Sequence, residues 1–213
     1  MSDPVLHEVF MHLVLPNEPV KATVVGNELC MRGKSASYVR HVCVDVSGTP
    51  LEGNFKAGQS FGVIPEGVDH NGKPHKVRLY SIASPSSGED GQGKVLSTTC
   101  KRLIDEISPQ TSRDDPENTG LFLGGCSNYI SDRKPGDEIL VSGPAGKRFV
   151  LPVDADGHDY MFLATGTGIA PYRGMVKDLF EGERACTGQV HLVMGAPYTS
   201  DLLYDDFFEQ VDK

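Results

Sequence analysis

The feature that most constrains this chain is an alternation of apolar strands and helices in its last quarter. Residues 160–164 are continuously apolar, as expected of a strand that is covered on both faces. A glycine-rich turn follows, and residues 171–181 then carry apolar side chains at helical spacing. A second apolar strand is expected at residues 190–195, and residues 202–211 are expected to form the first part of a further helix. This succession predicts a parallel sheet with right-handed crossovers.

The earlier part of the chain has the pattern of an antiparallel sheet. Short apolar or alternating runs, ended by glycine or proline, predict strands at residues 39–46, 61–65 and 76–83. Asn71-Gly72 is expected to form a tight turn. Short strands separated by turns are typical of an antiparallel barrel or sandwich. Residues 101–107 fit either a helix or a strand, and the pattern does not decide between them.

The change of pattern after about Pro152 predicts two domains. Residues 1–153 are expected to form an antiparallel β-barrel domain, in which residues 1–18 are a leader of uncertain order. Residues 154–213 begin a parallel α/β domain, and the segment 154–157 marks the boundary. A doubly wound sheet usually has about five or six strands. We therefore expect the second domain to be incomplete and the chain to be a fragment.

Charge and cysteine content argue against several classes of protein. The 213-residue chain has a formal net charge of -9, whereas non-specific nucleic-acid binding needs a basic surface. Its 5 cysteines include no CxxC pair and its histidines lack partners at metal-site spacing, so we predict reduced thiols and no metal. No apolar run approaches the roughly 20 residues of a membrane helix, and no signal peptide is recognisable. We expect a soluble intracellular protein, or a mature form whose leader was removed.

Two short motifs carry groups suited to a nucleotide. The turn Thr165-Gly166-Thr167-Gly168-Ile169-Ala170-Pro171 joins a strand to a helix, where glycines let a phosphate approach backbone N–H groups. In Arg78-Leu79-Tyr80-Ser81, strand geometry places Arg78 and Tyr80 on one face, so a guanidinium and a phenol ring can meet one ligand while Leu79 packs inward. Taken alone, these motifs also fit a plain turn and an exposed strand end. The same two interpretations stay open for Gly124-Gly125-Cys126-Ser127, whose groups suit phosphate oxygens or a simple turn.

Taken together, the motifs closely resemble those of the plant-type ferredoxin–NADP reductases. They share the order and the gaps of that family from about Val20 to the end of the chain. The matching stretches are Gly58-Gln59-Ser60, Ile64-Pro65-Glu66-Gly67-Val68-Asp69, Asn71-Gly72-Lys73-Pro74, Arg78-Leu79-Tyr80-Ser81-Ile82-Ala83-Ser84, Lys101-Arg102-Leu103, Cys126-Ser127-Asn128-Tyr129, Lys134-Pro135-Gly136-Asp137, Thr165 to Pro171, and Leu202-Leu203-Tyr204. The resemblance implies a flattened antiparallel barrel that binds FAD, followed by a parallel sheet that binds NADP.

The resemblance also implies roles for individual residues. Arg78 would pair with the FAD pyrophosphate, Tyr80 would stack on the isoalloxazine ring, and Ser81, the catalytic candidate, would lie near the flavin N5. The implied FAD-binding set is Arg78, Leu79, Tyr80, Ser81, Thr99, Cys100, Lys101, Gly125, Cys126, Ser127 and Thr167. The implied NADP-binding set is Lys101, Thr167, Gly168, Ala196 and Pro197. The family often has a tyrosine near the adenine where this chain has Asp105, so an aromatic ring is missing at that position.

The function implied is that of an FAD-dependent oxidoreductase that moves electrons between NADP(H) and ferredoxin or flavodoxin. Its location would be the cytoplasm or, for a mature form, the plastid stroma. Nine basic residues fit either a docking patch for an acidic partner or a solvated barrel surface. They are Lys73, Lys76, Arg78, Lys101, Arg102, Arg133, Lys134, Lys147 and Arg148. Alternatives are the reductase component of an oxygenase or other diflavin-type system, and a flavin-binding fragment without turnover. Because the family's later NADP-binding segments are absent, we expect flavin binding but negligible NADPH oxidation.

Overall fold

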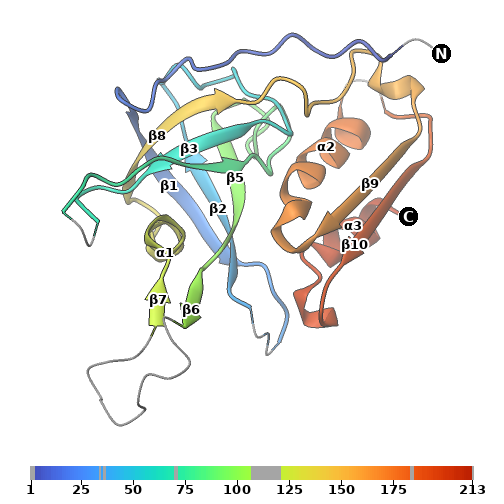
Figure 1. Cartoon of the computed structure of the whole chain (residues 1–213). Helices are drawn as coiled ribbons and strands as arrows, with labels where there is room; N and C mark the ends of the chain where they lie inside the picture. The colour runs from blue at the N-terminus through green and yellow to red at the C-terminus, as the bar shows by residue number, and fades with distance from the viewer. Residues whose placement is uncertain are drawn as a thin grey trace.

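The computed structural model describes residues 3–33, 35, 37–69, 72–106, 121–182 and 185–212 (Figure 1). Asn71 of the predicted tight turn and Ile107 of the undecided segment lie outside these residues. In Figure 1 a twisted antiparallel sheet lies beside a smaller unit built from helices and strands. Within the described ranges, no helix combines the length and the apolar character needed to cross a membrane.

The larger unit is a six-stranded sheet in the order β4-β3-β8-β1-β2-β5. Its strands are β1 (Val20–Leu29), β2 (Val39–Asp45), β3 (Ser60–Ile64), β4 (Arg78–Ser81), β5 (Val95–Lys101) and β8 (Glu138–Ala145). All the neighbouring strands pair antiparallel. The two end strands meet where Ile82 bridges Thr98 and where the Thr98 hydroxyl donates to the Ser81 carbonyl at 2.8 Å. The sheet therefore closes on itself, which confirms the antiparallel barrel.

The barrel interior is filled by alternate residues of its strands. In β2, Val42 and Val44 are fully buried, whereas Cys43 between them is only half-buried. In β3, Phe61 and Val63 point into the same core. This two-residue period is the pattern that predicted the strand at residues 39–46, whereas the strand at 61–65 was predicted from a short apolar run that ends at a proline.

A helix covers one side of the barrel core, and a short ribbon projects beside it. The ribbon consists of β6 (Ile104–Glu106) and β7 (Leu121–Leu123), and β7 leads into helix α1 (Gly125–Asp132). Lys101 ends β5 and Ile104–Glu106 form β6, so no helix forms in the described part of residues 101–107. Gly125 to Ser127 begin a helix, with Gly124 as its cap, rather than forming a plain turn. Local propensity does not favour a helix that starts with two glycines. The helix forms because Cys126 and Ile130 are buried against the barrel core.

The second unit follows the predicted strand–helix–strand order. It contains β9 (Tyr160–Thr165), η2 (Gly166–Ile169), α2 (Ala170–Glu181), β10 (Val190–Gly195), η3 (Thr199–Asp201) and α3 (Asp205–Val211), after the single turn η1 (Ala155–Gly157). β9 and β10 pair in parallel, as predicted. The last helix begins at Asp205 rather than at 202, because Tyr204 has a left-handed backbone with φ of 60° that interrupts the chain before it.

The prediction that β9 is covered on both faces is wrong for the part of the chain that the structure describes. Phe162 and Ala164 are buried, but Met161 and Leu163 between them are 69% and 63% exposed. The buried residues pack against α2 and α3. The helices therefore cover one face of this two-stranded sheet, and the other face carries apolar side chains in contact with water.

Candidate functional site

Strand β4 consists of the predicted motif Arg78-Leu79-Tyr80-Ser81 and lies at the edge of the barrel interior. Arg78 pairs with Val63 and Tyr80 pairs with Phe61. Since Val63 and Phe61 both lie in the core, Arg78 and Tyr80 share the inner face of β4. Leu79 lies on the opposite face and is 61% exposed, so the prediction that it packs inward is wrong. The period of two was right, but only the register with β3 decides which face is inside.

Tyr80 is half-buried against the core, and its hydroxyl interacts with the thiols of Cys100 and Cys126. Burial is the main cause that raises the pKa of Tyr80 well above its ordinary value, and the two neighbouring thiols add to this shift. Burial also raises the pKa of Cys100 to about 11 and raises that of Cys126, although the charge of Arg78 opposes the latter shift. Both thiols are therefore neutral near pH 7, which argues against Cys126 as a nucleophile.

The N-terminus of α1 meets this strand. Its cap, Gly124, has an extended backbone, and among the described residues no side chain caps the helix and no acidic residue lies in its first turn. Backbone N–H groups at Gly125, Cys126 and Ser127 have no partner within the helix, as in any first turn. Such a terminus favours anions. A Cβ at Gly124 would lie 2.7 Å from the Ser127 Oγ, so the close approach requires glycine there.

The end of β5 links two groups of predicted residues. Cys100 points into the barrel core, where its thiol lies 3.7 Å from the Ser127 carbonyl. Thr99 points the other way and its hydroxyl lies 2.5 Å from the Tyr204 hydroxyl, so its side chain is engaged by the second unit. Lys101 is exposed at the strand end. The structure thus brings Arg78, Tyr80, Cys100, Cys126 and Ser127 together, but not the Thr99 side chain.

A second group of predicted residues lines a small cavity of about 70 Å³ between the two units. Thr167 follows β9, and Ala196 and Pro197 follow β10, so they lie at the carboxyl ends of two parallel strands. Lys101 faces them from the barrel, whereas Gly168 is not part of the lining. Ligands of open parallel sheets bind beyond the carboxyl ends of the strands. This cavity is therefore a candidate nucleotide cleft.

A buried ionic network joins the two units, and the sequence analysis missed it. Arg173 of α2 lies 2.5 Å from Glu89, and the two side chains are only 13% and 17% exposed. Burial alone would raise the pKa of Glu89, but hydrogen bonds from His41, Arg173 and Ser97 hold it well below its usual range. The His41 Nδ1 also lies 2.8 Å from the hydroxyl of Tyr204. Only the Leu202-Leu203-Tyr204 motif signalled part of this network.

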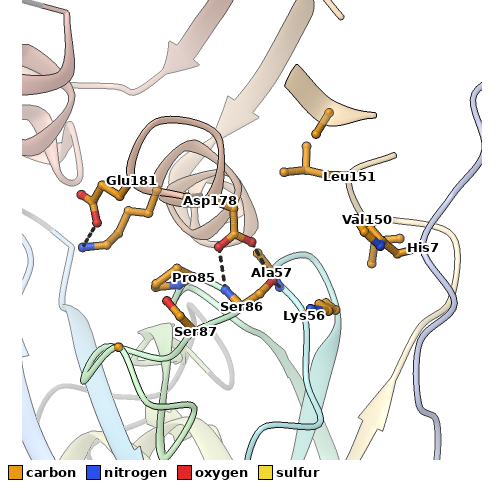
Figure 2. A pocket seen from close by; sticks show the side chains of 14 residues that line it. His7, Lys56, Ala57, Pro85, Ser86, Ser87, Val150, Leu151, Asp178 and Glu181 are labelled. Carbon is orange, nitrogen blue, oxygen red and sulfur yellow. Dashed lines mark hydrogen bonds and ion pairs between the residues drawn. The ribbon is translucent and has the colours of Figure 1, made fainter. Parts of the chain in front are cut away.

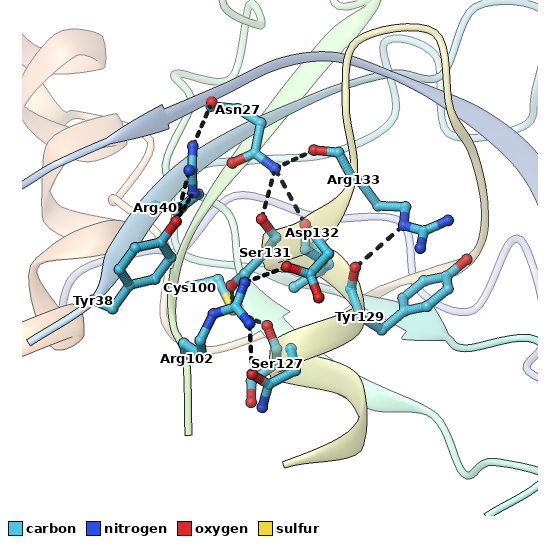
Figure 3. Close-up of polar contacts among 12 residues, drawn as sticks. Asn27, Tyr38, Arg40, Cys100, Arg102, Ser127, Tyr129, Ser131, Asp132 and Arg133 are labelled. Carbon is cyan, nitrogen blue, oxygen red and sulfur yellow. Dashed lines mark hydrogen bonds and ion pairs between the residues drawn. The ribbon is translucent and has the colours of Figure 1, made fainter. Parts of the chain in front are cut away.

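Arg102 is held in a polar cluster beside α1 (Figure 3). Its guanidinium donates to the Asn128 amide oxygen at 2.9 Å and pairs with Asp132. The same guanidinium lies 5.0 Å from the centre of the Tyr38 ring, a cation–π distance. Arg102 was counted among the basic residues of a docking patch, but these contacts tie it to the helix.

Another cavity among the described residues contains none of the predicted site residues. It has a volume of about 780 Å³ and lies between α2 and loops of the barrel (Figure 2). Asp178 of α2 accepts hydrogen bonds there from the Ser86 backbone N–H at 2.8 Å and the Ser86 hydroxyl at 2.6 Å. The lining of this cavity also includes the charged side chains of Lys56, Lys177 and Glu181. None of the lining residues belongs to the sets that the resemblance implies for FAD or NADP.

Comparisons with known proteins find relatives of one kind. Residues 162–213 match the family model for the oxidoreductase NAD-binding domain. A ferredoxin–NADP reductase of Thermosynechococcus vestitus is 37% identical over 207 residues, which are 96% of this chain and 51% of that protein. Root isozyme 1 of the chloroplastic enzyme of Arabidopsis thaliana is 36% identical and covers 98% of this chain, which spans 54% of it.

Solved structures agree with the sequence relatives. The ferredoxin–NADP+ reductase of Plasmodium falciparum superposes with a TM-score of 0.73 at 27% identity, covering 94% of this chain and 67% of that one. The same enzyme with 2'P-AMP also superposes with a TM-score of 0.73. The chain spans about half the length of the curated relatives that it matches. By sequence and by fold, this chain is a homologue of the ferredoxin–NADP reductases over nearly all of its own length.

Proposed function

We propose that this chain is the flavin-binding part of an FAD-dependent oxidoreductase that moves electrons between NADP(H) and ferredoxin or flavodoxin. One observation carries the proposal: Arg78, Tyr80 and the N-terminus of α1 come together from segments far apart in the sequence. A guanidinium, an aromatic ring and free backbone N–H groups are what a dinucleotide with a flat ring system requires. The named relatives are ferredoxin–NADP reductases, which supports the same assignment.

The residues of the first group fit FAD. In the proposed arrangement Arg78 pairs with the pyrophosphate, and Gly125, Cys126 and Ser127 donate to it through backbone N–H groups and a hydroxyl. The Tyr80 ring would cover one face of the isoalloxazine and keep water from it, whereas Leu79 lies on the other face of β4 and is assigned to the FAD site by the resemblance alone. Ser81 donates a hydrogen bond at the reacting nitrogen. A bound flavin accepts a hydride from a nicotinamide and passes its electrons on singly, which links NADPH to a one-electron carrier.

The second group is assigned to NADP(H) within the same proposal. Lys101 provides a positive charge at the cavity, and Thr167, Ala196 and Pro197 line it after β9 and β10. Gly168 follows Thr167 in the same turn and is assigned to NADP(H) with it. Thr167 would lie between the flavin and the nicotinamide. We divide the chain accordingly into an FAD-binding domain at 1–153 and part of an NADP-binding domain at 154–213. The protein would work in the cytoplasm or the plastid stroma, and an acidic carrier would dock on exposed basic residues such as Lys73 and Lys76.

The experiment is a titration of the purified chain with FAD, followed by flavin fluorescence. Arg78→Ala should weaken FAD binding about tenfold or more, because a charge-assisted contact to a phosphate is lost. Arg148→Ala is the matched control, since Arg148 is an exposed arginine outside the proposed site. Equal affinities of both variants and the unchanged chain, or no binding of FAD at all, would count against the proposal.

A further inference from the structure

The ribbon β6–β7 projects from the barrel next to α1 (Figure 1). Its two strands are antiparallel, with Ile104 opposite Leu123 and Asp105 opposite Phe122. Residues directly opposite each other in an antiparallel pair lie on the same face. One face of the ribbon therefore carries Ile104 and Leu123, and the other face carries Asp105 and Phe122.

Phe122 is the single aromatic residue among the described residues of this ribbon, and it is 46% exposed. It belongs to none of the hydrophobic core clusters of the described chain. An aromatic ring offers a large flat surface for stacking, and this one is left partly in water. The ring therefore leaves a flat apolar surface accessible to a ligand.

The base of the ribbon is fixed to the N-terminus of α1. The Gly124 N–H donates to the Leu103 carbonyl at 2.9 Å, and the Leu103 N–H donates to the Ser127 hydroxyl at 3.1 Å. The Asn128 amide adds a bond to the Leu103 carbonyl at 2.9 Å. These contacts hold the ribbon at a constant position beside the anion-binding end of the helix.

The spacing from Phe122 to the helix end suits a nucleotide. Phe122 stands two residues before Gly124, and a strand rises about 3.3 Å per residue, so their Cα atoms are no more than about 7 Å apart. A base and its phosphate are separated by one ribose, which is a comparable reach. A ligand whose phosphates lie at Gly125 to Ser127 therefore has Phe122 within reach of its base.

We propose that Phe122 provides the surface on which the adenine of FAD stacks. The inference rests on the proposed function, because it takes the phosphates of FAD to lie at α1. A carboxylate offers no ring for stacking, so at this pair of positions the platform is Phe122 and not Asp105. The aliphatic face with Ile104 and Leu123 points away from that surface and has no ring to offer.

The first test compares FAD with FMN, which lacks the adenylate half. Phe122→Ala should raise the dissociation constant for FAD about tenfold and leave that for FMN unchanged, since stacking of a base on an aromatic ring is lost. Leu123→Ala is the matched control: it removes a side chain that is 56% exposed on the other face, and should change neither constant more than about twofold.

The outcomes separate the two proposals. An unchanged FAD affinity in Phe122→Ala, or the same loss for FAD in Leu123→Ala, overturns the stacking role and leaves the flavin site standing. A wild-type chain that binds neither FAD nor FMN overturns both. A Phe122→Ala variant that loses FAD and FMN equally overturns the stacking role as well, because FMN has no adenine.

A second measurement does not depend on flavin binding. The chain contains no tryptophan, so Phe122→Trp introduces a single fluorophore at the proposed platform. Titration with 5′-AMP should quench its fluorescence saturably, because the adenine stacks on the indole. The same titration of Leu123→Trp should leave its fluorescence unchanged. Quenching of equal strength in both variants, or in neither, contradicts the proposal.

Discussion

The barrel and the parallel unit bury their apolar surface in different ways. In the barrel, Phe61 and Val44 reach zero exposure because the sheet closes on itself and encloses its own core. In the parallel unit, Phe162 is buried under the helices while Met161 and Leu163 on the other face remain exposed. The barrel is thus a self-contained frame, whereas the parallel unit depends on its neighbours for burial.

This difference separates the two candidate sites. Arg78, Tyr80 and α1 belong to the barrel and its attached helix, so their geometry is set by one closed core. The small cavity with Lys101 and Thr167 lies between the units, so its shape depends on how they are held together. The buried pair Arg173–Glu89 and the hydroxyl contacts of Tyr204 form that connection.

The largest effect is expected in the barrel core. Phe61→Ala should lower the free energy of unfolding by about 3–5 kcal/mol, because it leaves a cavity in a closed core. Met161→Ala, on the open face of β9, should change it by about 0.5 kcal/mol or less. Urea unfolding followed by circular dichroism measures both. Similar losses of unfolding free energy in the two variants would show that this face of β9 is buried in solution, and would contradict the difference between the barrel and the parallel unit.

A smaller effect is expected at the junction. Arg173→Met leaves the Glu89 carboxylate buried without its main cation, and should cost about 2 kcal/mol of stability. Hydrogen exchange should speed up in β9, β10 and α2 more than in β1 and β2, since the barrel keeps its own core. Arg148→Met is the control, because Arg148 is exposed. Uniform acceleration across the chain would mean that the two units open as one.

The smallest effect is a pH dependence that belongs to the barrel. Burial raises the pKa of Cys100 from 9.0 to about 11, so the folded state holds this proton more tightly than the unfolded chain. Stability from this thiol is therefore complete below about pH 9 and is lost as the pH rises toward about 11. The loss should reach about 1 kcal/mol by pH 10.

Urea unfolding at pH 8 and pH 10 measures this difference, and Cys100→Ala should remove its share of it. A pH dependence that is the same in Cys100→Ala and in the unchanged chain would show that the thiol does not stay protonated inside the barrel.

Much of the fold follows from local patterns. The two-residue period predicted the strand in 39–46, and a short apolar run ended by proline predicted the strand in 61–65. The 3.6-residue period predicted α2. Each of these patterns depends only on neighbours in sequence. The placement of Arg78 and Tyr80 on one face has the same local origin. The antiparallel barrel and the parallel unit were predictable because the two halves of the chain differ in these patterns.

Other features depended on contacts between distant segments. Leu79 faces outward because the register with β3 turns Tyr80 toward Phe61, and helix α1 forms because the barrel buries Ile130. Arg173 and Glu89 are 84 residues apart, so no local pattern joins them. The sequence by itself determined which residues form strands and helices and which motifs suit a nucleotide. Tertiary structure decided which face of each strand is inside and which charges are paired, because both depend on packing between segments that are remote along the chain.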